Sequence, residues 1–216
     1  MLKGLELRRD VIETAQGLVR ARLNSSTWGN ISVRDPENGG FFITPSGMDY
    51  DKLTPEDIVL VDFDGRVIEG IRKPSTETPM HALFYRERPD IGAVVHTHSI
   101  YATTMAVLKK EIPPVIAELA AGVGGSVPVA DYATFGTLEL GASALKAMGN
   151  KRAVLLQNHG VVAMGNNLVE AGRLAAIVED AAQIYYLAQV IGTPTMVPAD
   201  ELDKLYQAFQ KGYGQK

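Results

Sequence analysis

The chain has no cysteine among its 216 residues. This absence excludes disulfide bridges and thiolate ligands, so any bound metal must be held by nitrogen and oxygen atoms. A run of about 18 apolar residues, as in a membrane-spanning helix, is also lacking. The first 23 residues carry charges throughout and have no uninterrupted apolar core like that of a signal peptide. We therefore expect a soluble cytoplasmic protein without a membrane partner.

The chain also has no excess of basic over acidic residues. The formal net charge is −4 and the sequence pI is about 5.6, which argues against a general binder of nucleic acid or acidic membranes. Hydrophobic residues make up 46% of the chain and charged residues 21%, as is usual for folded globular proteins. The length suits one domain spanning residues 1–216.

Histidine is scarce, with four in the chain, and two of them form the sequence His96-Thr97-His98. They follow an apolar run within Ile91–Ser99 that is typical of a buried strand. Side chains two residues apart on a strand point to the same face, roughly 6.5–7 Å apart along it. His96 and His98 can therefore converge on one ion.

His159 lies at a similar position after another apolar run, Ala153–Leu156. Gly160 permits a tight turn before the next apolar run, Val161–Met164. A lone histidine beside a strand is usually structural, but three at strand ends favour a metal site. Three imidazoles suit a borderline-soft divalent cation with one coordination position left open.

Three loops of small polar residues are candidate anion sites because their backbone amides are little obstructed by side chains. The last of these loops precedes a predicted helix at 78–87, whose dipole would favour an anion at its start. Taken singly, such loops are usually only turns. The residues concerned are Gly29 and Asn30, Thr44, Ser46 and Gly47, and Ser75 and Thr76.

Glu77 stands at the start of that helix, with His81 four residues later on the same predicted face. A carboxylate here usually caps free amides or complements the helix dipole. A functional role for Glu77 depends on its proximity to the three histidines. For His81 we expect a supporting or packing role rather than metal ligation.

Hydrophobic periodicity predicts alternating helices and strands. An Asp64-Gly65 pair between strand-like runs indicates an antiparallel hairpin. The predicted helices cover residues 5–23, 78–87, 100–108, 137–148, 167–191 and 200–210; the predicted strands include 31–34, 58–62, 127–130, 153–156 and 161–164. The long helix should bury a stripe of Val169, Leu174, Ile177, Ala181, Ile184 and Leu187. The expected fold is a single three-layer α/β/α domain with a central, mostly antiparallel sheet.

Five short motifs, GNIS, ITPSG, PSTE, VVHTHS and LLQNHG, occur in this order along the chain. As a set they resemble the class II aldolase/adducin family, and most closely its fuculose-1-phosphate aldolase-like branch. The resemblance covers nearly the whole chain and implies the same three-layer fold.

The resemblance also implies roles for individual residues. His96, His98, His159 and Glu77 correspond to the family's zinc ligands, and Mn²⁺ or Co²⁺ stays an alternative ion. Glu77 would also be the catalytic acid/base once substrate displaces it from the metal. Tyr213 corresponds to a catalytic tyrosine that reaches a neighbouring subunit's site. The implied phosphate pocket consists of Gly29, Asn30, Ser46, Gly47, Ser75 and Thr76.

The implied activity is that of a zinc-dependent aldolase. It would cleave a short ketose 1-phosphate, such as L-fuculose 1-phosphate or a deoxy-ketose analogue, into dihydroxyacetone phosphate and an aldehyde. A homotetramer with active sites between subunits is implied too. One departure is Ala117, near a position where the aldolase branch carries a second active-site tyrosine. The alternatives are a pentulose 5-phosphate 4-epimerase, a methylthioribulose-1-phosphate dehydratase and a non-catalytic adducin-like module.

Overall fold

The computed structural model describes residues 2–25 and 27–211. One eight-stranded sheet runs through the molecule in the order β4-β3-β2-β1-β5-β8-β7-β6. Every pairing among the described strands is antiparallel except β6 with β7. The strands are β1 (Asn30–Asp35), β2 (Gly40–Ile43), β3 (Val59–Asp62), β4 (Val67–Glu69), β5 (Ala93–Thr97), β6 (Val129–Ala130), β7 (Ala153–Leu156) and β8 (Gly160–Gly165).

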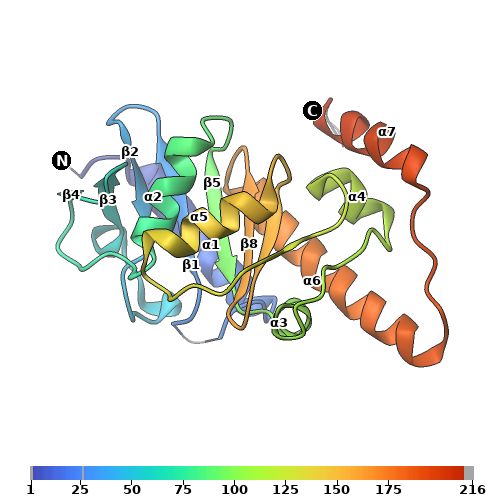
Figure 1. Cartoon of the computed structure of the whole chain (residues 1–216). Coiled ribbons are helices and arrows are strands. Elements are labelled where there is room, and N and C mark those ends of the chain that lie inside the picture. The colour runs from blue at the N-terminus through green and yellow to red at the C-terminus, as the bar shows by residue number, and fades with distance from the viewer. Residues whose placement is uncertain (1, 26, 212–216) are drawn as a thin grey trace.

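Helices cover both faces of the sheet (Figure 1). One hydrophobic cluster joins the sheet to α1, α3, α4 and α6, and a second joins the opposite face to α2 and α5. The helices are α1 (Leu5–Arg20), α2 (Thr78–Glu87), α3 (Ile100–Val107), α4 (Ala117–Val123), α5 (Leu138–Met148), α6 (Leu168–Ile191) and α7 (Ala199–Gln210). The predicted three-layer α/β/α domain with a mostly antiparallel sheet is thus confirmed.

Alternation along the central strands divides their side chains between the two clusters. In β5, Ala93 and Val95 belong to the first cluster and Val94 to the second. In β8, Val161 belongs to the first and Val162 to the second. These strands are therefore apolar on both faces, which explains why the sequence shows them as continuous apolar runs.

Two sequence predictions need correction. The first helix ends at Arg20 rather than near residue 23, because Arg22 adopts a positive φ of 60° that turns the chain. The stripe predicted for α6 is partly wrong, since Val169 is 81% exposed and Ile184 and Leu187 are about half exposed. The buried face of α6 consists of Leu168, Ala171, Leu174, Ala175, Val178, Ala181 and Ala182, mostly small residues that allow close packing on the sheet.

Helix α6 is long and apolar enough to cross a membrane by length and composition alone. Its N-terminal two thirds instead pack on β5 and β8, as expected for the core helix of a globular domain. Beyond α6 the chain turns back, with the Val197 amide donating to the Pro114 carbonyl, and α7 packs on α4 (Figure 1).

Arg8 is the largest fully buried side chain and ties α1 to the β3–β4 edge. Its guanidinium donates to the carbonyls of Lys3, Pro55 and Ile58, and its Nη2 lies 2.7 Å from Glu69 Oε1. A buried charge with this many acceptors is fully compensated, and removing it leaves the carbonyls without donors.

We expect Arg8→Met to lower the free energy of unfolding by about 2 to 3 kcal/mol, because it leaves buried acceptors unsatisfied. Urea unfolding followed by circular dichroism measures this. Arg9→Met is the matched control, since Arg9 is exposed on the same helix, and it should change stability by less than about 0.5 kcal/mol. Equal effects of the two substitutions would contradict the role given to Arg8.

Candidate functional site

The pairing of β1, β5 and β8 brings the three histidines together. His96 lies in β5 opposite Asn30 of β1 and Val162 of β8, and His98 follows just beyond the end of β5. His159 closes the hairpin between β7 and β8. The three ring centroids lie 4.8 to 5.0 Å apart. The convergence that the sequence predicted for His96, His98 and His159 is therefore present.

The ring nitrogens point inward. His96 Nε2 lies 2.9 Å from His98 Nε2, and one potential ligand atom from each of the three rings lies within 4.8 Å of the others. The other nitrogen of His96, Nδ1, is 2.9 Å from the Val161 carbonyl and donates to it. This hydrogen bond fixes the tautomer that leaves Nε2 available as a ligand.

The β7–β8 hairpin places His159 through a tight loop. Asn158 has a φ of 57°, and the His159 amide donates to the Leu156 carbonyl. A Cβ at Gly160 would lie 2.4 Å from the Thr97 carbonyl oxygen and 3.1 Å from ring carbons of His96 and His98. Glycine at 160 is therefore required for the close approach of the hairpin to the histidines.

Glu77 sits at the N-cap position of α2, but its side chain makes no capping hydrogen bond. Its carboxylate instead faces the histidines, with Oε2 3.1 Å from His96 Nε2 and Oε1 3.5 Å from His159 Nε2. Asn30 Nδ2 donates to Oε2 over 2.7 Å. Oε1 is buried without a hydrogen-bond partner. Glu77 thus belongs to the histidine cluster rather than to the helix cap.

The electrostatics of the cluster are those of a buried cation site. Burial acts to raise the pKa of Glu77, but His96, His159 and the Asn30 amide outweigh it and hold that pKa well below its usual range. Burial acts to lower the pKa of His96, and the Glu77 carboxylate outweighs it, so this pKa is raised. Burial and the neighbouring imidazoles lower the pKa of His98 to about 3 and that of His159 to about 4. His98 and His159 are therefore neutral at pH 7, as metal ligands must be.

These residues fit a divalent metal ion. Three imidazole nitrogens and one carboxylate oxygen form the donor set typical of zinc, and the unpartnered Oε1 of Glu77 is an acceptor that a cation would satisfy.

The predicted phosphate-binding loops line one cavity beside the histidines, of about 360 Å³. The isolated bridge between Pro45 and Pro74, and the hydrogen bond from the Ser46 amide to the Lys73 carbonyl, hold two of these loops together. Gly29 has a φ of 77° and touches the His96 carbonyl so closely that no side chain fits there. The lining residues are Thr27, Trp28, Gly29, Asn30, Pro45, Ser46, Gly47, Ser75, Thr76, Glu77, His98, Phe135 and His159.

Comparison with known proteins agrees with this geometry. Residues 9–186 match the family model described as the class II aldolase and adducin N-terminal domain. The chain belongs to this family. The family is metal-dependent, which accords with the three-histidine group.

Individual relatives align over almost the whole chain. A 5-deoxy-D-ribulose 1-phosphate aldolase of Bacillus thuringiensis serovar kurstaki is 45% identical over 209 residues, 97% of both chains. A 5-methylthioribulose-1-phosphate/5-deoxyribulose-1-phosphate aldolase of Rhodospirillum rubrum is 41% identical over 97% of this chain and 93% of its own. A solved L-fuculose 1-phosphate aldolase superposes with a TM-score of 0.93 at 40% identity, covering 97% of this chain and 98% of its own.

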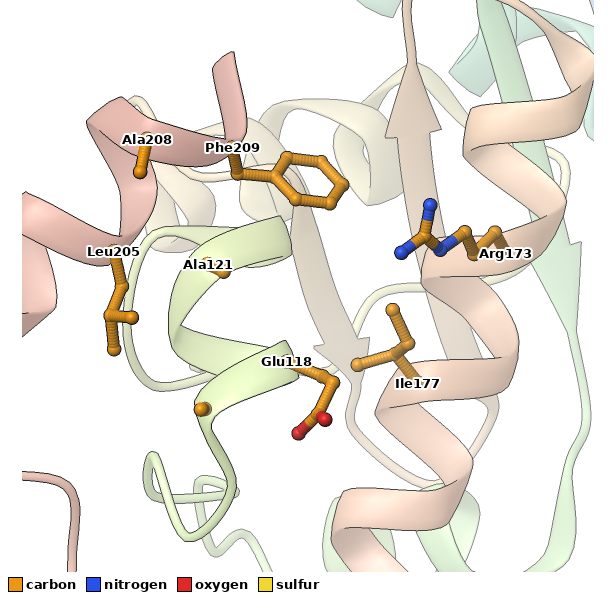
Figure 2. A pocket seen from close by; sticks show the side chains of 8 residues that line it. Glu118, Ala121, Arg173, Ile177, Leu205, Ala208 and Phe209 are labelled. Atoms are coloured by element: carbon orange, nitrogen blue, oxygen red, sulfur yellow. The ribbon is translucent and has the colours of Figure 1, made fainter. Parts of the chain in front are cut away.

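Two further residues were predicted for the site of this class II aldolase/adducin chain. Tyr213 lies outside the described residues. Ala117 starts α4 and lines a separate, mostly apolar cavity of about 290 Å³ between α4, α6 and α7 (Figure 2). In that cavity the Arg173 guanidinium lies over the Phe209 ring, with Cζ 5.3 Å from the ring centroid. Ala117 therefore does not reach the histidine cluster of the same chain.

Sequence reasoning missed two aromatic side chains at the histidine cavity. Trp28 is 60% exposed with its ring 5.7 Å from that of His98, and Phe135 is 64% exposed. Large exposed aromatics beside a cavity are available to contact a ligand or partner. Trp28 adjoins the Gly29–Asn30 loop and could have been noticed there, but nothing local in the sequence connects Phe135 to the site.

We expect Gly160→Ala to weaken Zn²⁺ binding by about 10-fold to 100-fold, because the added methyl displaces Thr97 and the two adjacent imidazoles. Competition with a chromophoric chelator measures the affinity. Gly192→Ala is the control, since a Cβ there meets no atom within 4 Å. An unchanged affinity in the Gly160 variant would refute the requirement for glycine.

The metal-free protein should lose stability as the pH falls from about 6.5 to 4. In this window the unfolded chain protonates histidines near pH 6.5, whereas the folded state keeps His81, His98 and His159 neutral because burial lowers their pKa values to about 3, 3 and 4. Each such group lowers the free energy of unfolding by about 1.4 kcal/mol for each unit by which the pH falls within this window. Thermal unfolding across this pH range tests the prediction, and a pH-independent stability would contradict it.

Proposed function

We propose that the protein is a metal-dependent aldolase that cleaves a short ketose 1-phosphate reversibly into dihydroxyacetone phosphate and a small aldehyde. The observation that carries the proposal is the shared cavity: three converging imidazoles and a buried, half-satisfied carboxylate lie beside three small-residue loops. Zn²⁺ is the proposed ion, held by His96, His98, His159 and, before substrate binds, Glu77. Mn²⁺ and Co²⁺ are the alternative ions.

The three loops are proposed to bind the substrate phosphate. Ser75 and Thr76 precede the N-terminus of α2, where free amides and the helix dipole favour an anion. Ser46 and Gly47 line the same cavity from the loop after β2, and Gly29 and Asn30 line it from the start of β1. Phosphate binding would hold the three-carbon unit over the histidines and so reduce the entropy cost of the reaction.

The bond that breaks joins carbons 3 and 4 of the ketose. When bound, the cation supplies Lewis-acid stabilisation of the negative charge that develops on the substrate oxygens. The electron pair left on carbon 3 takes a proton from Glu77, which would take that proton up from solvent once substrate has separated it from the histidines. Oε1 is the proposed donor atom because it is the carboxylate oxygen without a hydrogen-bond partner. In the reverse direction the same oxygen removes that proton. Tyr213, from a neighbouring subunit, is proposed to handle the proton of the carbon 4 hydroxyl.

The substrate is proposed to be 5-deoxyribulose 1-phosphate or L-fuculose 1-phosphate. The relatives named for deoxyribulose phosphate and fuculose phosphate are similarly close to this chain. Trp28 and Phe135 give the mouth of the cavity an apolar character that suits the methyl-bearing aldehydes formed from both sugars.

We also propose a cytoplasmic homotetramer with active sites between subunits. Next to His98, the exposed side chains of Ile100, Val107 and Leu108 line an apolar hollow that a neighbouring subunit would cover. Helix α7 lies beyond the matched residues 9–186, and we treat it as part of the same single domain because it packs on α4.

Two of the alternatives, the epimerase and the non-catalytic module, find less support. An epimerase needs a second acid/base carboxylate, and among the described residues that line the cavity Glu77 is the only carboxylate. A non-catalytic module has no use for converging imidazoles beside an unpartnered buried carboxylate oxygen.

The proposal predicts release of dihydroxyacetone phosphate from 5-deoxyribulose 1-phosphate or L-fuculose 1-phosphate by the zinc-loaded protein. Chelation should abolish the activity and added Zn²⁺ should restore it. Glu77→Gln should lower kcat by about 10²-fold to 10⁴-fold, because the amide cannot transfer the proton. A coupled dehydrogenase assay measures the rates, and Glu118→Gln, in the other cavity, is the control. Absence of triose phosphate from both sugars in the zinc-loaded protein would refute the proposal.

A further inference from the structure

A line of hydrogen-bonded, buried side chains between β1 and α2 ends at the carboxylate of Glu77. Tyr85 Oη lies 2.8 Å from Ser32 Oγ, and Ser32 Oγ lies 2.6 Å from His81 Nδ1. On the other side of the imidazole, His81 Nε2 lies 2.6 Å from Asn30 Oδ1. Asn30 Nδ2 then donates to Glu77 Oε2 over 2.7 Å.

Regular secondary structure assembles this line. Asn30 and Ser32 are two residues apart in β1, so their side chains leave the same face of the sheet. Glu77, His81 and Tyr85 recur every four residues along α2 and its N-cap, so they lie on one side of the helix. The two elements meet along these side chains.

The proton positions in the line follow from the chemistry of its ends. A carboxylate only accepts, so Asn30 must turn its Nδ2 to Glu77 and its Oδ1 to His81. His81 must then carry its proton on Nε2 and accept at Nδ1 from the Ser32 hydroxyl. Ser32 in turn accepts from the Tyr85 hydroxyl. Each group has one role that is consistent with its neighbours.

Water does not reach the middle of this line. Ser32 and His81 are fully buried, and Tyr85 and Asn30 are at most 5% exposed. Burial also lowers the pKa of His81 to about 3, so the imidazole is neutral at pH 7. The orientation of the Asn30 amide is therefore fixed from both sides, by the Glu77 carboxylate at Nδ2 and by the His81 Nε2–H at Oδ1. A flipped amide would set Oδ1 against the carboxylate and Nδ2 against a donor.

We propose that His81 is a positioning residue for proton transfer: it fixes the Asn30 amide, which holds Oε2 of Glu77 and leaves Oε1 as the oxygen that faces the reacting carbon. This inference rests on the proposed aldolase function. It gives Asn30 a role toward the carboxylate in addition to its expected place in the phosphate pocket.

The test follows the proton-transfer step alone, with zinc-loaded protein and dihydroxyacetone phosphate in deuterium oxide. NMR measures exchange of the hydrogen on the hydroxymethyl carbon, which needs no aldehyde. His81→Phe removes the donor and should slow exchange by about 10-fold to 100-fold. Its KM for the ketose phosphate and its zinc content should stay as in the wild type. His81→Gln can still donate to Asn30 Oδ1 and should recover exchange to within about 3-fold of the wild type.

Phe84→Leu is the matched control, because Phe84 is a buried neighbour on α2 with no polar role in the line. It should leave exchange unchanged. Wild-type exchange in His81→Phe would overturn the inference, as would an equal loss in the Phe84 variant. Equal impairment of the His81→Gln and His81→Phe variants would also overturn it.

A second measurement does not depend on activity. The ¹⁵N NMR spectrum of the imidazoles should show that the His81 ring is neutral and protonated on Nε2. The His81 signals are assigned as those that disappear from the spectrum of His81→Gln. A ring protonated on Nδ1 would overturn the inference. If the wild type neither exchanges nor cleaves, the proposed function fails, whereas the spectrum still tests the direction of the hydrogen bonds.

Discussion

The antiparallel pairing of β1, β5 and β8 at the middle of the sheet is the constraint on which the site depends. It sets Asn30 opposite His96, and it sets the strand after His159 beside the strand that ends just before His98. The candidate metal ligands are thus held by backbone ladders rather than by loops alone. Gly29 and Gly160 permit this arrangement because each lies too close to a carbonyl of the β5 segment to carry a side chain.

The imidazoles of the site and the residues that face them come from different elements. The sheet supplies the imidazoles, whereas α2 supplies Glu77 from its N-cap and His81 from its first turns. The packing of α2 on β1 therefore sets the distance between carboxylate and imidazoles, and a hydrogen-bonded amide from β1 adjusts its orientation. The proposed binding of phosphate at the start of the same helix would connect substrate position to Glu77, the proposed acid/base.

Much of this could be predicted from the sequence. The spacing of His96 and His98 reports strand geometry directly, and the α2 boundaries were predicted to the residue. The role of Asn30 toward Glu77 could not be foreseen, because it depends on a contact between residues 47 positions apart. The predicted buried stripe of α6 was partly wrong because periodicity shows which positions are apolar, not which are buried. Part of the apolar surface of α6 is exposed in the chain. Phe135 was missed because only the folded loop before α5 brings it to the cavity.

The location of β5 has one more consequence. This strand has partners on both sides and helices over both faces, so it has no edge at which local opening can begin. We therefore expect its amides to exchange with solvent only when the whole domain unfolds, whereas we expect α7, which has no buried residue, to open at little cost in free energy. The geometry of His96 is therefore as long-lived as the native state itself.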